Sequence, residues 1–430
     1  MAKPLNKGQQ LAADGFFEFL LTDEKEMIIS GAGGVGKTYL MGYLIDEIMP
    51  RYHETCRLLG IPIDFDEVVM CATTNKAAEV LTVSTGRPTS TVHSFMNLTV
   101  KDDYSTGRSF IKKTAAWTVH QRKIIFIDEC SMIDSDLMAM LMEGTYKCKI
   151  IYVGDHSQLA PVMEALSPVY KKNLRMYVLD EPMRNADQPA LKDVCQQIRE
   201  TVASGIFNPI QVVPGVVDWF DDNQMELEVY NHFYDPDNNH RILAYTNNRV
   251  LEFNDHIRGI RNLPDTFTKG EHLINNSAIR LGKSMISVEQ EVTIRHMNDI
   301  TSLVDMGNGV ELEVRHCDLE NSIGEMFYGV PIPVDRDHYT ALMKWYGKQK
   351  DWQRYFELKN KYPDLRQRDA STVHKSQGST YDTVFIDMAN LSTCRNPDLA
   401  ARLLYVAFTR PRNRVIMYGD LVEKFGGIIV

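Results

Sequence analysis

No apolar run in this sequence approaches the ~20 residues that a membrane-spanning helix needs. The chain opens with Met1-Ala2-Lys3-Pro4-Leu5-Asn6, which lacks the apolar core of a signal peptide. Its 7 cysteines are widely scattered and no pair has C-x-x-C spacing, so neither a zinc site nor a redox motif is indicated. These absences argue against a membrane partner and favour a cytoplasmic protein with reduced thiols.

Basic residues are in the minority, since 47 Lys and Arg stand against 57 Asp and Glu, for a formal net charge of −10. Phosphate backbones attract basic surfaces, so this balance is not typical of a protein that nucleic acid coats. A protein that grips one strand in an internal channel, however, needs positive charge only along that channel. The net charge therefore does not decide whether nucleic acid is a partner.

The 430 residues are too many for one ordinary core, so two or three domains are expected. Short β-branched runs recur along the chain, with turn residues and helical patterns between them. Continuous apolar strands that alternate with helices predict an α/β fold with parallel sheets covered on both faces. These runs are 27–30, 68–72, 123–128 and 149–154, and later 241–245, 383–387 and 414–418.

Two segments depart from this pattern. Within 262–365, stretches such as Val310–Val314 alternate with period two, which predicts a small antiparallel insertion. A helical stretch rich in Lys, Trp and Tyr, Tyr339–Lys361, closes this insertion. A turn flanked by short strands between Val100 and Gln121 predicts a β-hairpin.

The strongest local signal satisfies the pattern G-x-x-x-x-G-K-[ST] between a predicted strand and a predicted helix. Glycines let the backbone wrap phosphates closely, so that successive N–H groups and the helix N-terminus face the anion. Lys37 is expected to reach the β- and γ-phosphates, and Thr38 to ligate Mg²⁺. The alternative, a Gly-rich turn with a solvated lysine, fits this context poorly. The string is Gly31-Ala32-Gly33-Gly34-Val35-Gly36-Lys37-Thr38.

An acidic pair, Asp128-Glu129, follows a predicted buried strand. Ligands of open α/β sheets bind at the carboxyl ends of strands, so this position favours a catalytic pair over a solvated surface pair. Asp128 can hold Mg²⁺ through water, and Glu129 can act as general base on the attacking water. These features alone predict an ATPase with a phosphate-binding loop, and they leave kinases, nucleotide switches and motors all open.

Further strings occur in order along the chain, and together they resemble the motifs of superfamily 1 DNA helicases. Those at 154–162 (Gly-Asp-His-Ser-Gln-Leu-Ala-Pro-Val) and 372–379 (Thr-Val-His-Lys-Ser-Gln-Gly-Ser) resemble the RecD-like branch, and within it the Dda-like enzymes of phages, rather than the UvrD-like branch. One departure is Thr73 and Asn75, where Dda-like proteins usually have proline and, in some, histidine. The other strings are 5–9, 72–78, 91–95, 128–132, 179–185 and 404–410.

The resemblance implies a particular set of nucleotide contacts. Gln9 reads the adenine, Thr38 and Asp128 hold Mg²⁺, and Lys37, Glu129 and Gln158 complete the first wall of an ATP cleft. Two arginines, Arg184 and Arg410, reach the γ-phosphate from a second domain when the cleft closes, and Gln377 and Gly378 also lie at the nucleotide. An arginine finger of this kind typically accelerates hydrolysis by ~10³–10⁵.

The resemblance also implies a channel for a single strand of DNA. Hydroxyl groups suit phosphate contacts that position the strand without reading its sequence. His93 and His374 could instead be structural, and Asn75 offers an amide with no aromatic face for base stacking. The implied strand contacts are Thr73, Thr74, Asn75, Thr91, His93, Thr372 and His374.

The predicted hairpin corresponds to the strand-separating pin of Dda-like enzymes, at about 99–122. Phe110 is favoured over Tyr104 as the ring that stacks on a base, because Arg108, Lys112 and Lys113 flank it. For each ring, packing against its own hairpin is the alternative. The stretch Trp345–Lys361 could contact nucleic acid, but bracing the pin is the favoured interpretation.

The expected architecture has two RecA-like domains with parallel sheets. The first spans 1–178 and carries the pin, the second combines 179–261 with 366–430, and an SH3-like insertion spans 262–365. The expected function is an ATP-dependent DNA helicase that moves 5′→3′ on single-stranded DNA and unwinds forked duplex. A translocase that strips proteins from DNA, a nucleotide switch or kinase, and an inactive scaffold are the alternatives. The chain is expected to be a monomer in the host cytoplasm if a phage encodes it, with a single-strand-binding protein as a candidate partner.

Overall fold

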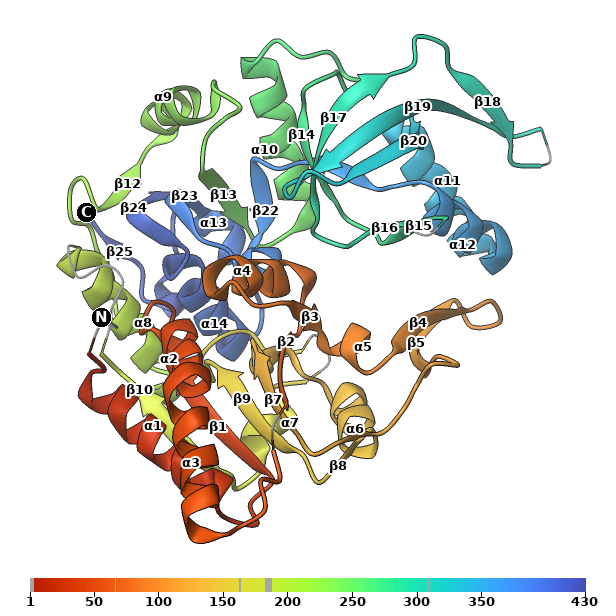
Figure 1. Cartoon of the computed structure of the whole chain (residues 1–430). Coiled ribbons are helices and arrows are strands. Elements are labelled where there is room, and N and C mark those ends of the chain that lie inside the picture. The colour runs from red at the N-terminus through yellow and green to blue at the C-terminus, as the bar shows by residue number, and fades with distance from the viewer. Residues whose placement is uncertain (1–3, 66, 162–163, 182–187, 283, 308) are drawn as a thin grey trace. The chain divides into compact units, whose positions relative to one another are not determined.

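The computed structural model describes residues 4–65, 67–161, 164–181, 188–282, 284–307 and 309–430 (Figure 1). The chain forms two compact units. Unit 1 comprises Met1–Thr99, Ile111–Asp221 and Ser376–Val430, and unit 2 comprises Val100–Phe110 and Asp222–Lys375. The boundaries of these compact units differ from the domain boundaries that the motif pattern predicts. The domain boundaries given above stay predictions.

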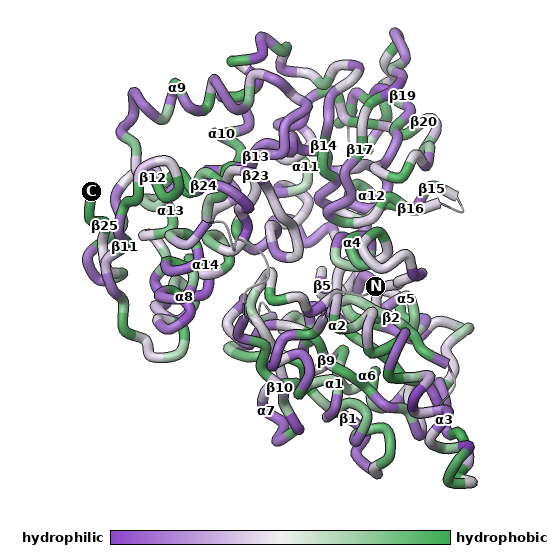
Figure 2. The backbone as a smooth tube through the Cα atoms, turned by 60° about the vertical axis from the view of Figure 1, so that its left-hand side comes forward, coloured by the Kyte–Doolittle hydropathy of each residue, from purple (hydrophilic) through white to green (hydrophobic). Residues whose placement is uncertain are grey.

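The main sheet of unit 1 is fully parallel, as the continuous apolar runs predict. Figure 2 shows hydrophobic stretches along several of its strands. Its strand order is β10-β1-β9-β7-β2-β3. The strands are β1 (Glu26–Gly31), β2 (Glu67–Ala72), β3 (Thr89–Thr91), β7 (Lys123–Asp128), β9 (Lys149–Gly154) and β10 (Arg175–Leu179).

Helices cover both faces of this sheet. The helices and helical turns of unit 1 are α1 (Lys7–Leu20), α2 (Lys37–Tyr43), η1 (Leu44–Ile48), α3 (Met49–Leu59), α4 (Asn75–Thr85), α5 (Val92–Phe95), η2 (Cys130–Met132), α6 (Ser135–Glu143), α7 (Pro168–Lys171), α8 (Pro189–Ser204), α13 (Met388–Leu391), α14 (Pro397–Phe408) and η4 (Glu423–Phe425). The turn η3 (Val373–Ser376) runs across the boundary between the units.

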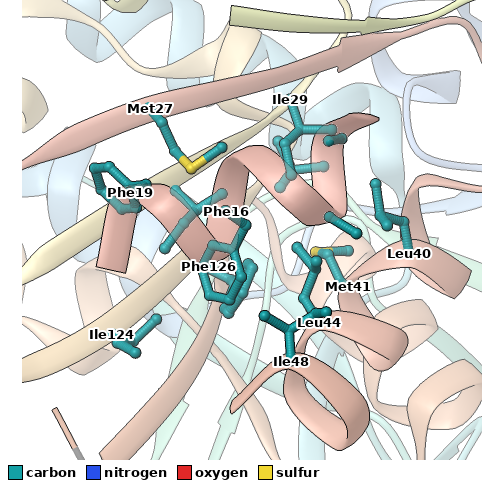
Figure 3. Close-up of a cluster of buried hydrophobic side chains, with 14 of the residues drawn as sticks. Phe16, Phe19, Met27, Ile29, Leu40, Met41, Leu44, Ile48, Ile124 and Phe126 are labelled. Atoms are coloured by element: carbon teal, nitrogen blue, oxygen red, sulfur yellow. The ribbon is translucent and has the colours of Figure 1, made fainter. Parts of the chain in front are cut away.

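Alternate residues of each central strand enter separate cores. Met27 and Ile29 pack with Phe16 and Phe126 in a core that α1, α2 and α3 cover (Figure 3). Ile28, between them in β1, packs in the core on the other face, which includes α6 side chains. This alternation explains why the strands read as unbroken apolar runs.

The helix that follows the glycine-rich loop is longer than predicted. The sequence predicts a helix over about 37–49, yet the helical path continues through a π turn to Leu59. In that turn the N–H of Met49 donates to the carbonyl of Leu44, five residues back, and Pro50 then lies in the first turn of α3. A proline at that position removes no helical hydrogen bond, so the chain stays helical.

Strands of a second parallel set fall into both units. In unit 1, β12 (Val217–Phe220), β24 (Pro411–Tyr418) and β23 (Tyr381–Asp387) pair in parallel. In unit 2, β13 (His240–Ala244) pairs in parallel with β22 (Ala370–Thr372). The short pairs β6 (His120–Gln121) with β8 (Thr145–Tyr146) and β11 (Ile210–Gln211) with β25 (Ile428–Ile429) complete unit 1.

The antiparallel strands predicted within 262–365 are present in unit 2, and their SH3-like character stays a prediction. The strands are β14 (His272–Asn275), β15 (Ile279–Leu281), β16 (Ser284–Ile286), β17 (Glu291–Met297), β18 (Ser302–Asp305), β19 (Glu311–Asn321), β20 (Met326–Pro333) and β21 (Leu365–Gln367). The helices of unit 2 are α9 (Asp222–Phe233), α10 (Asn247–Ile260), α11 (Arg336–Gln349) and α12 (Trp352–Lys361).

Within the described ranges, no helix has both the length and the apolar character that crossing a bilayer requires.

A buried lysine fixes the end of α1 to the main sheet. Lys149 is 3% exposed. Its Nζ donates to the carbonyl oxygens of Phe19 at 2.8 Å, Thr22 at 2.6 Å and Glu24 at 2.5 Å. Carbonyls at and beyond the end of a helix lack helical partners, so one ammonium group satisfies several of them at once.

We predict that Lys149→Met lowers the free energy of unfolding by about 3 kcal/mol, because buried carbonyls lose their donor. Denaturant titration followed by circular dichroism measures the change. Lys25→Met is the matched control, since Lys25 is an exposed lysine near the same segment. Equal stability of the two variants would contradict the prediction.

Candidate functional site

The glycine-rich loop connects β1 to α2 at the edge of the main sheet where the parallel strands end. Gly34 and Gly36 have φ angles of 85° and 82°, a left-handed backbone that side chains disfavour. A Cβ on Gly31 would lie 2.7 Å from the carbonyl oxygen of Leu179, so that position also has room only for glycine. Val35 points into the core and anchors the loop.

Lys37 begins α2 and folds back over the loop. Its Nζ donates to the carbonyl oxygens of Gly31 at 2.8 Å and Ala32 at 3.0 Å. Thr38 follows in the first turn of the helix. Both residues therefore lie in the first turn of the helix that follows the loop, and their contacts with phosphate and Mg²⁺ stay predictions.

Asp128 is the last residue of β7, and Glu129, which follows it, has a strained backbone conformation. Glu129 has a φ of 53°, and its carbonyl accepts a hydrogen bond from the Thr73 hydroxyl at 3.1 Å. Burial raises the pKa of Asp128, and the nearby positive charge of Lys37 partly offsets this increase. Burial and the neighbouring charge of Asp128 raise the pKa of Glu129 to about 7, within reach of a proton acceptor at neutral pH. A non-glycine residue held at positive φ is a feature of functional sites.

Residues far apart in sequence complete the site within unit 1. The side-chain amide of Gln377 donates to Gln158 Oε1 at 3.0 Å and to the Ser131 hydroxyl at 3.2 Å. A Cβ on Gly378 would lie 3.9 Å from Glu129 Oε1. Strings 154–162 and 372–379 therefore meet beside the acidic pair.

Arg410 approaches the glycine-rich loop from the end of α14. A Cβ on Gly33 would lie 3.9 Å from Arg410 Nη2, and the guanidinium charge acts on Glu129. The guanidinium donates to the carbonyls of Val406 and Ser379, each at 3.1 Å. Arg184, the second predicted arginine, lies outside the described residues.

Gln9 is fully buried beneath the loop. Its backbone N–H bonds the Asn6 side chain at 2.8 Å, and its Oε1 accepts from the Asn6 N–H at 3.1 Å. Its Nε2 donates to the carbonyl of Val35 at 3.3 Å. The predicted adenine reader thus also caps α1 and contacts the phosphate loop.

Two residues that sequence reasoning did not single out tie string 154–162 to α14. Arg402 Nη1 donates to the carbonyls of His156 at 2.6 Å and Gln158 at 2.7 Å. The Tyr405 hydroxyl donates to the Asp155 carboxylate at 2.6 Å. The i, i+3 spacing that places Arg402 and Tyr405 on one helix face was a readable signal, but it does not name the partner loop.

The site has polar atoms that suit a ligand. Glu129 Oε2 and Gln377 Oε1 are buried and have no hydrogen-bond partner among the described residues. A pair of buried carboxylates beside a glycine-rich loop fits a divalent cation with phosphate, because oxygen ligands are those that Mg²⁺ takes. In the described part of the chain, no cluster of three or more His, Cys, Asp or Glu suits a metal held by protein alone.

The predicted strand contacts of unit 1 lie at the ends of β2 and β3. The hydroxyls of Thr74 and Thr91 cap α4 and α5 by accepting from Ala77 N at 3.2 Å and Ser94 N at 3.1 Å. Asn75 is exposed beside them. Burial lowers the pKa of His93, which favours its neutral form.

The remaining predicted contacts belong to unit 2. Thr372 is 5% exposed, which leaves little of its side chain for a ligand. The ring of His374 lies 6.3 Å from that of Tyr245, and burial lowers its pKa as well. Phe110 is 50% exposed, as the sequence predicts for a stacking ring. All these strand-contact assignments stay predictions.

The hairpin consists of β4 (Leu98–Asp103) and β5 (Arg108–Lys113), and its tip belongs to unit 2. The Tyr104 ring packs edge-on against Phe356 of α12, with centroids 5.2 Å apart. Asn360 Nδ2 donates to the Asp102 carboxylate at 2.9 Å, and a Cβ on Gly107 would meet the Trp352 ring at 2.6 Å. Residues of α12 therefore contact the hairpin tip, while the bracing and strand-separating roles stay predictions.

Comparison with known proteins finds similarities over nearly the whole chain. A family model described as an AAA domain matches residues 4–209, and one described as a UvrD-like helicase C-terminal domain matches residues 369–418. The chain is 25% identical over 449 residues to the ATP-dependent DNA helicase dda of Enterobacteria phage T4, which covers 95% of this chain and 98% of that protein.

Two solved structures share the fold. The Pif1 helicase from Bacteroides in complex with ADP-AlF3 and ssDNA has a TM-score of 0.52 at 16% identity, over 100% of this chain and 95% of that one. A structure titled for DNA unwinding at forked dsDNA by two coordinating Pif1 helicases has a TM-score of 0.53 at 16% identity, over 100% and 94%. Both confirm the predicted pair of RecA-like domains. Although the shorter family model is named for UvrD, the dda helicase matches 95% of this chain, and the two Pif1 structures share its fold. The chain is therefore a superfamily 1 helicase of the Dda- and Pif1-like type.

Proposed function

We propose that this chain is a motor that moves 5′→3′ along single-stranded DNA and separates the strands of a forked duplex. Its family makes it an ATP-dependent DNA helicase. The observation that carries the proposal is the meeting of Gln158, Gln377 and Arg410 around the glycine-rich loop and Glu129. A nucleotide switch or a small-molecule kinase gives these three residues no role.

The loop and Lys37 hold the phosphates of ATP. Backbone N–H groups at the start of α2 face an anion, and Lys37 can exchange its two loop carbonyls for phosphate oxygens. The side-chain amide of Gln9 donates a hydrogen bond to the carbonyl of Val35 in the loop, and Gln9 also recognises the adenine base in this proposal. Thr38 and Asp128 would hold Mg²⁺, which neutralises charge on the phosphates.

Glu129 acts as the general base. Its raised pKa makes it a better proton acceptor than an ordinary carboxylate while keeping it partly ionised at neutral pH. Its carbonyl is fixed by Thr73, so the carboxylate stays aimed into the site. Arg410, with Arg184 as the second arginine of the proposal, stabilises charge on the transferring phosphoryl group.

Contacts across the site couple hydrolysis to motion. Arg402 and Tyr405 hold the backbone of 155–158 to α14, and α14 ends two residues before Arg410. A displacement of Gln158 by a phosphate is therefore passed to the helix that carries the arginine. Both walls of the site come from one chain, so a monomer suffices for this cycle.

The strand contacts at Thr73, Thr74, Asn75, Thr91, His93, Thr372 and His374 belong to the proposal. The hydroxyl oxygens of Thr74 and Thr91 already accept hydrogen bonds from backbone N–H groups at the starts of α4 and α5. We therefore propose that these two residues orient the N-termini of the helices toward phosphates. The neutral forms favoured at His93 and His374 suit hydrogen bonds rather than ion pairs.

The function is tested with tailed duplexes. We predict ATP hydrolysis that single-stranded DNA stimulates, and unwinding from a 5′ tail but not from a 3′ tail. Lys37→Ala removes the phosphate cation and should abolish both activities while leaving the far-ultraviolet circular dichroism unchanged.

Unwinding only from a 3′ tail would contradict the direction. Stimulated hydrolysis without unwinding from either tail would instead identify a translocase that displaces proteins. Hydrolysis that DNA does not stimulate would favour a nucleotide switch or kinase.

The pKa of Glu129 predicts a pH profile. A protonated carboxyl cannot accept a proton from water, so activity is present above about 7 and lost as the pH falls through that value. We expect kcat/KM for ATP, which reports the free enzyme, to fall about tenfold per pH unit below that point. Nucleotide affinity measured at each pH is the control and should change far less. A flat profile across neutral pH would show that Glu129 does not titrate as the base.

A further inference from the structure

Unit 2 contains a cavity beside the hairpin tip that the nucleotide site and the predicted strand contacts do not use. Its volume is about 830 Å³, and it lies between the tip, α12, β15 and β20. Figure 1 shows α12 next to β15 and β16. Cavities of roughly 300–1,000 Å³ suit a small molecule or one residue of a polymer, whereas a duplex is far larger.

One wall of the cavity is a polar face of α12. Gln353, Glu357, Asn360 and Lys361 all line it. Their spacing of three, four, seven and eight residues puts them on one side of a helix. The opposite side of α12 packs Leu358 into the core of unit 2. The polar face is therefore held rigidly by the fold.

The hairpin tip contributes an aromatic ring to the lining, and packing holds this ring in place. Tyr104 is 56% exposed, and its ring rests edge-on against Phe356 at 5.2 Å. The neighbouring turn is fixed by Asp102, which accepts from Asn360, and by Gly107 against Trp352. A ring that is already ordered loses little entropy when a ligand stacks on it.

Two basic side chains reach the cavity without acidic partners. Arg280 of β15 and Lys361 of α12 both line it, and neither forms an ion pair within the part of the chain that the structure describes. Glu357 is the acidic residue of the lining. With Asn360 and Gln353 it offers hydrogen-bond donors and acceptors of the kind that meet a base edge.

We propose that this cavity binds one unpaired nucleotide at the DNA fork, with its base on Tyr104 and its phosphate between Arg280 and Lys361. Aromatic stacking and unpaired basic groups are together the chemistry of single-strand binding. The proposal rests on the proposed function, since a fork must be present. The nucleotide could come from either strand of the fork, and the same contacts would bind it.

The stacking is tested by fluorescence on forked DNA, with the full chain and without ATP. The fluorescent adenine analogue 2-aminopurine is placed at the first unpaired position of one strand and then of the other. We expect stacking on Tyr104 to quench the probe in one arm, which identifies the strand. Tyr104→Leu should abolish that quenching, and Tyr104→Phe, which keeps the ring, should retain it.

The phosphate contact is tested by the salt dependence of fork binding. Arg280→Ala and Lys361→Ala should each reduce the slope of log affinity against log salt by about 0.7–0.9, the value for one phosphate contact. Lys344→Ala is the matched control, because it removes an exposed lysine from α11 of the same unit and does not line the cavity. Thermal unfolding checks that every variant is folded.

Salt slopes equal to that of Lys344→Ala would overturn the proposal, as would quenching in both arms that ignores Tyr104→Leu. Either result would favour a segment of a partner protein, instead of a nucleotide, as the occupant of the cavity. These measurements use no ATP, so they fail independently of the motor. If the wild-type chain neither hydrolyses ATP nor unwinds DNA, the proposed function fails instead.

Discussion

Two neighbouring carboxylates, Asp128 and Glu129, end a central strand in a place where burial opposes the charge of both. Such a pair is tolerated only if cations compensate it, and the chain supplies them from distant points. Lys37 comes from the start of α2, and Arg410 comes from beyond the end of α14. This requirement explains how the surrounding segments are arranged. The glycine-rich loop, string 372–379 and α14 come together around the carboxylates, where they supply positive charge and exclude water. Binding of phosphate adds negative charge there, so it changes the balance that holds these segments together.

Much of this site could be predicted because its signals are local. A strand, a glycine-rich loop and a lysine at the start of a helix are neighbours in sequence, so the pattern alone predicts their geometry. The parallel sheet is equally readable, since both of its faces are buried and the central residues of a strand such as β7, Ile124–Ile127, are all apolar. The helix beyond Met49 was missed for a physical reason. A π turn moves Pro50 to a position where proline costs nothing, and no residue type marks that shift in advance.

Contacts made by buried polar groups were harder to predict. Tyr405 and Arg402 act on the backbone and carboxylate of a loop some 250 residues away in sequence, and only the folded chain brings them together. Hydroxyl side chains show the opposite difficulty. Thr74 and Thr91 match a pattern for phosphate contact, yet their oxygens accept backbone N–H groups at helix starts, which is the local role that such residues commonly have. A motif therefore identifies a position in the fold more securely than the atom that touches a ligand.

The string 372–379 crosses from one unit to the other between Lys375 and Ser376. Thr372 and His374, which carry the predicted strand contacts, stay with unit 2, and Gln377 and Gly378 stay with the nucleotide residues of unit 1. The two groups are only a few residues apart, so a short stretch of backbone joins the predicted strand contacts directly to the nucleotide residues. In the proposed motor no long relay of side chains would be needed between the nucleotide and the DNA strand, since the short turn Val373–Ser376 has residues in both units.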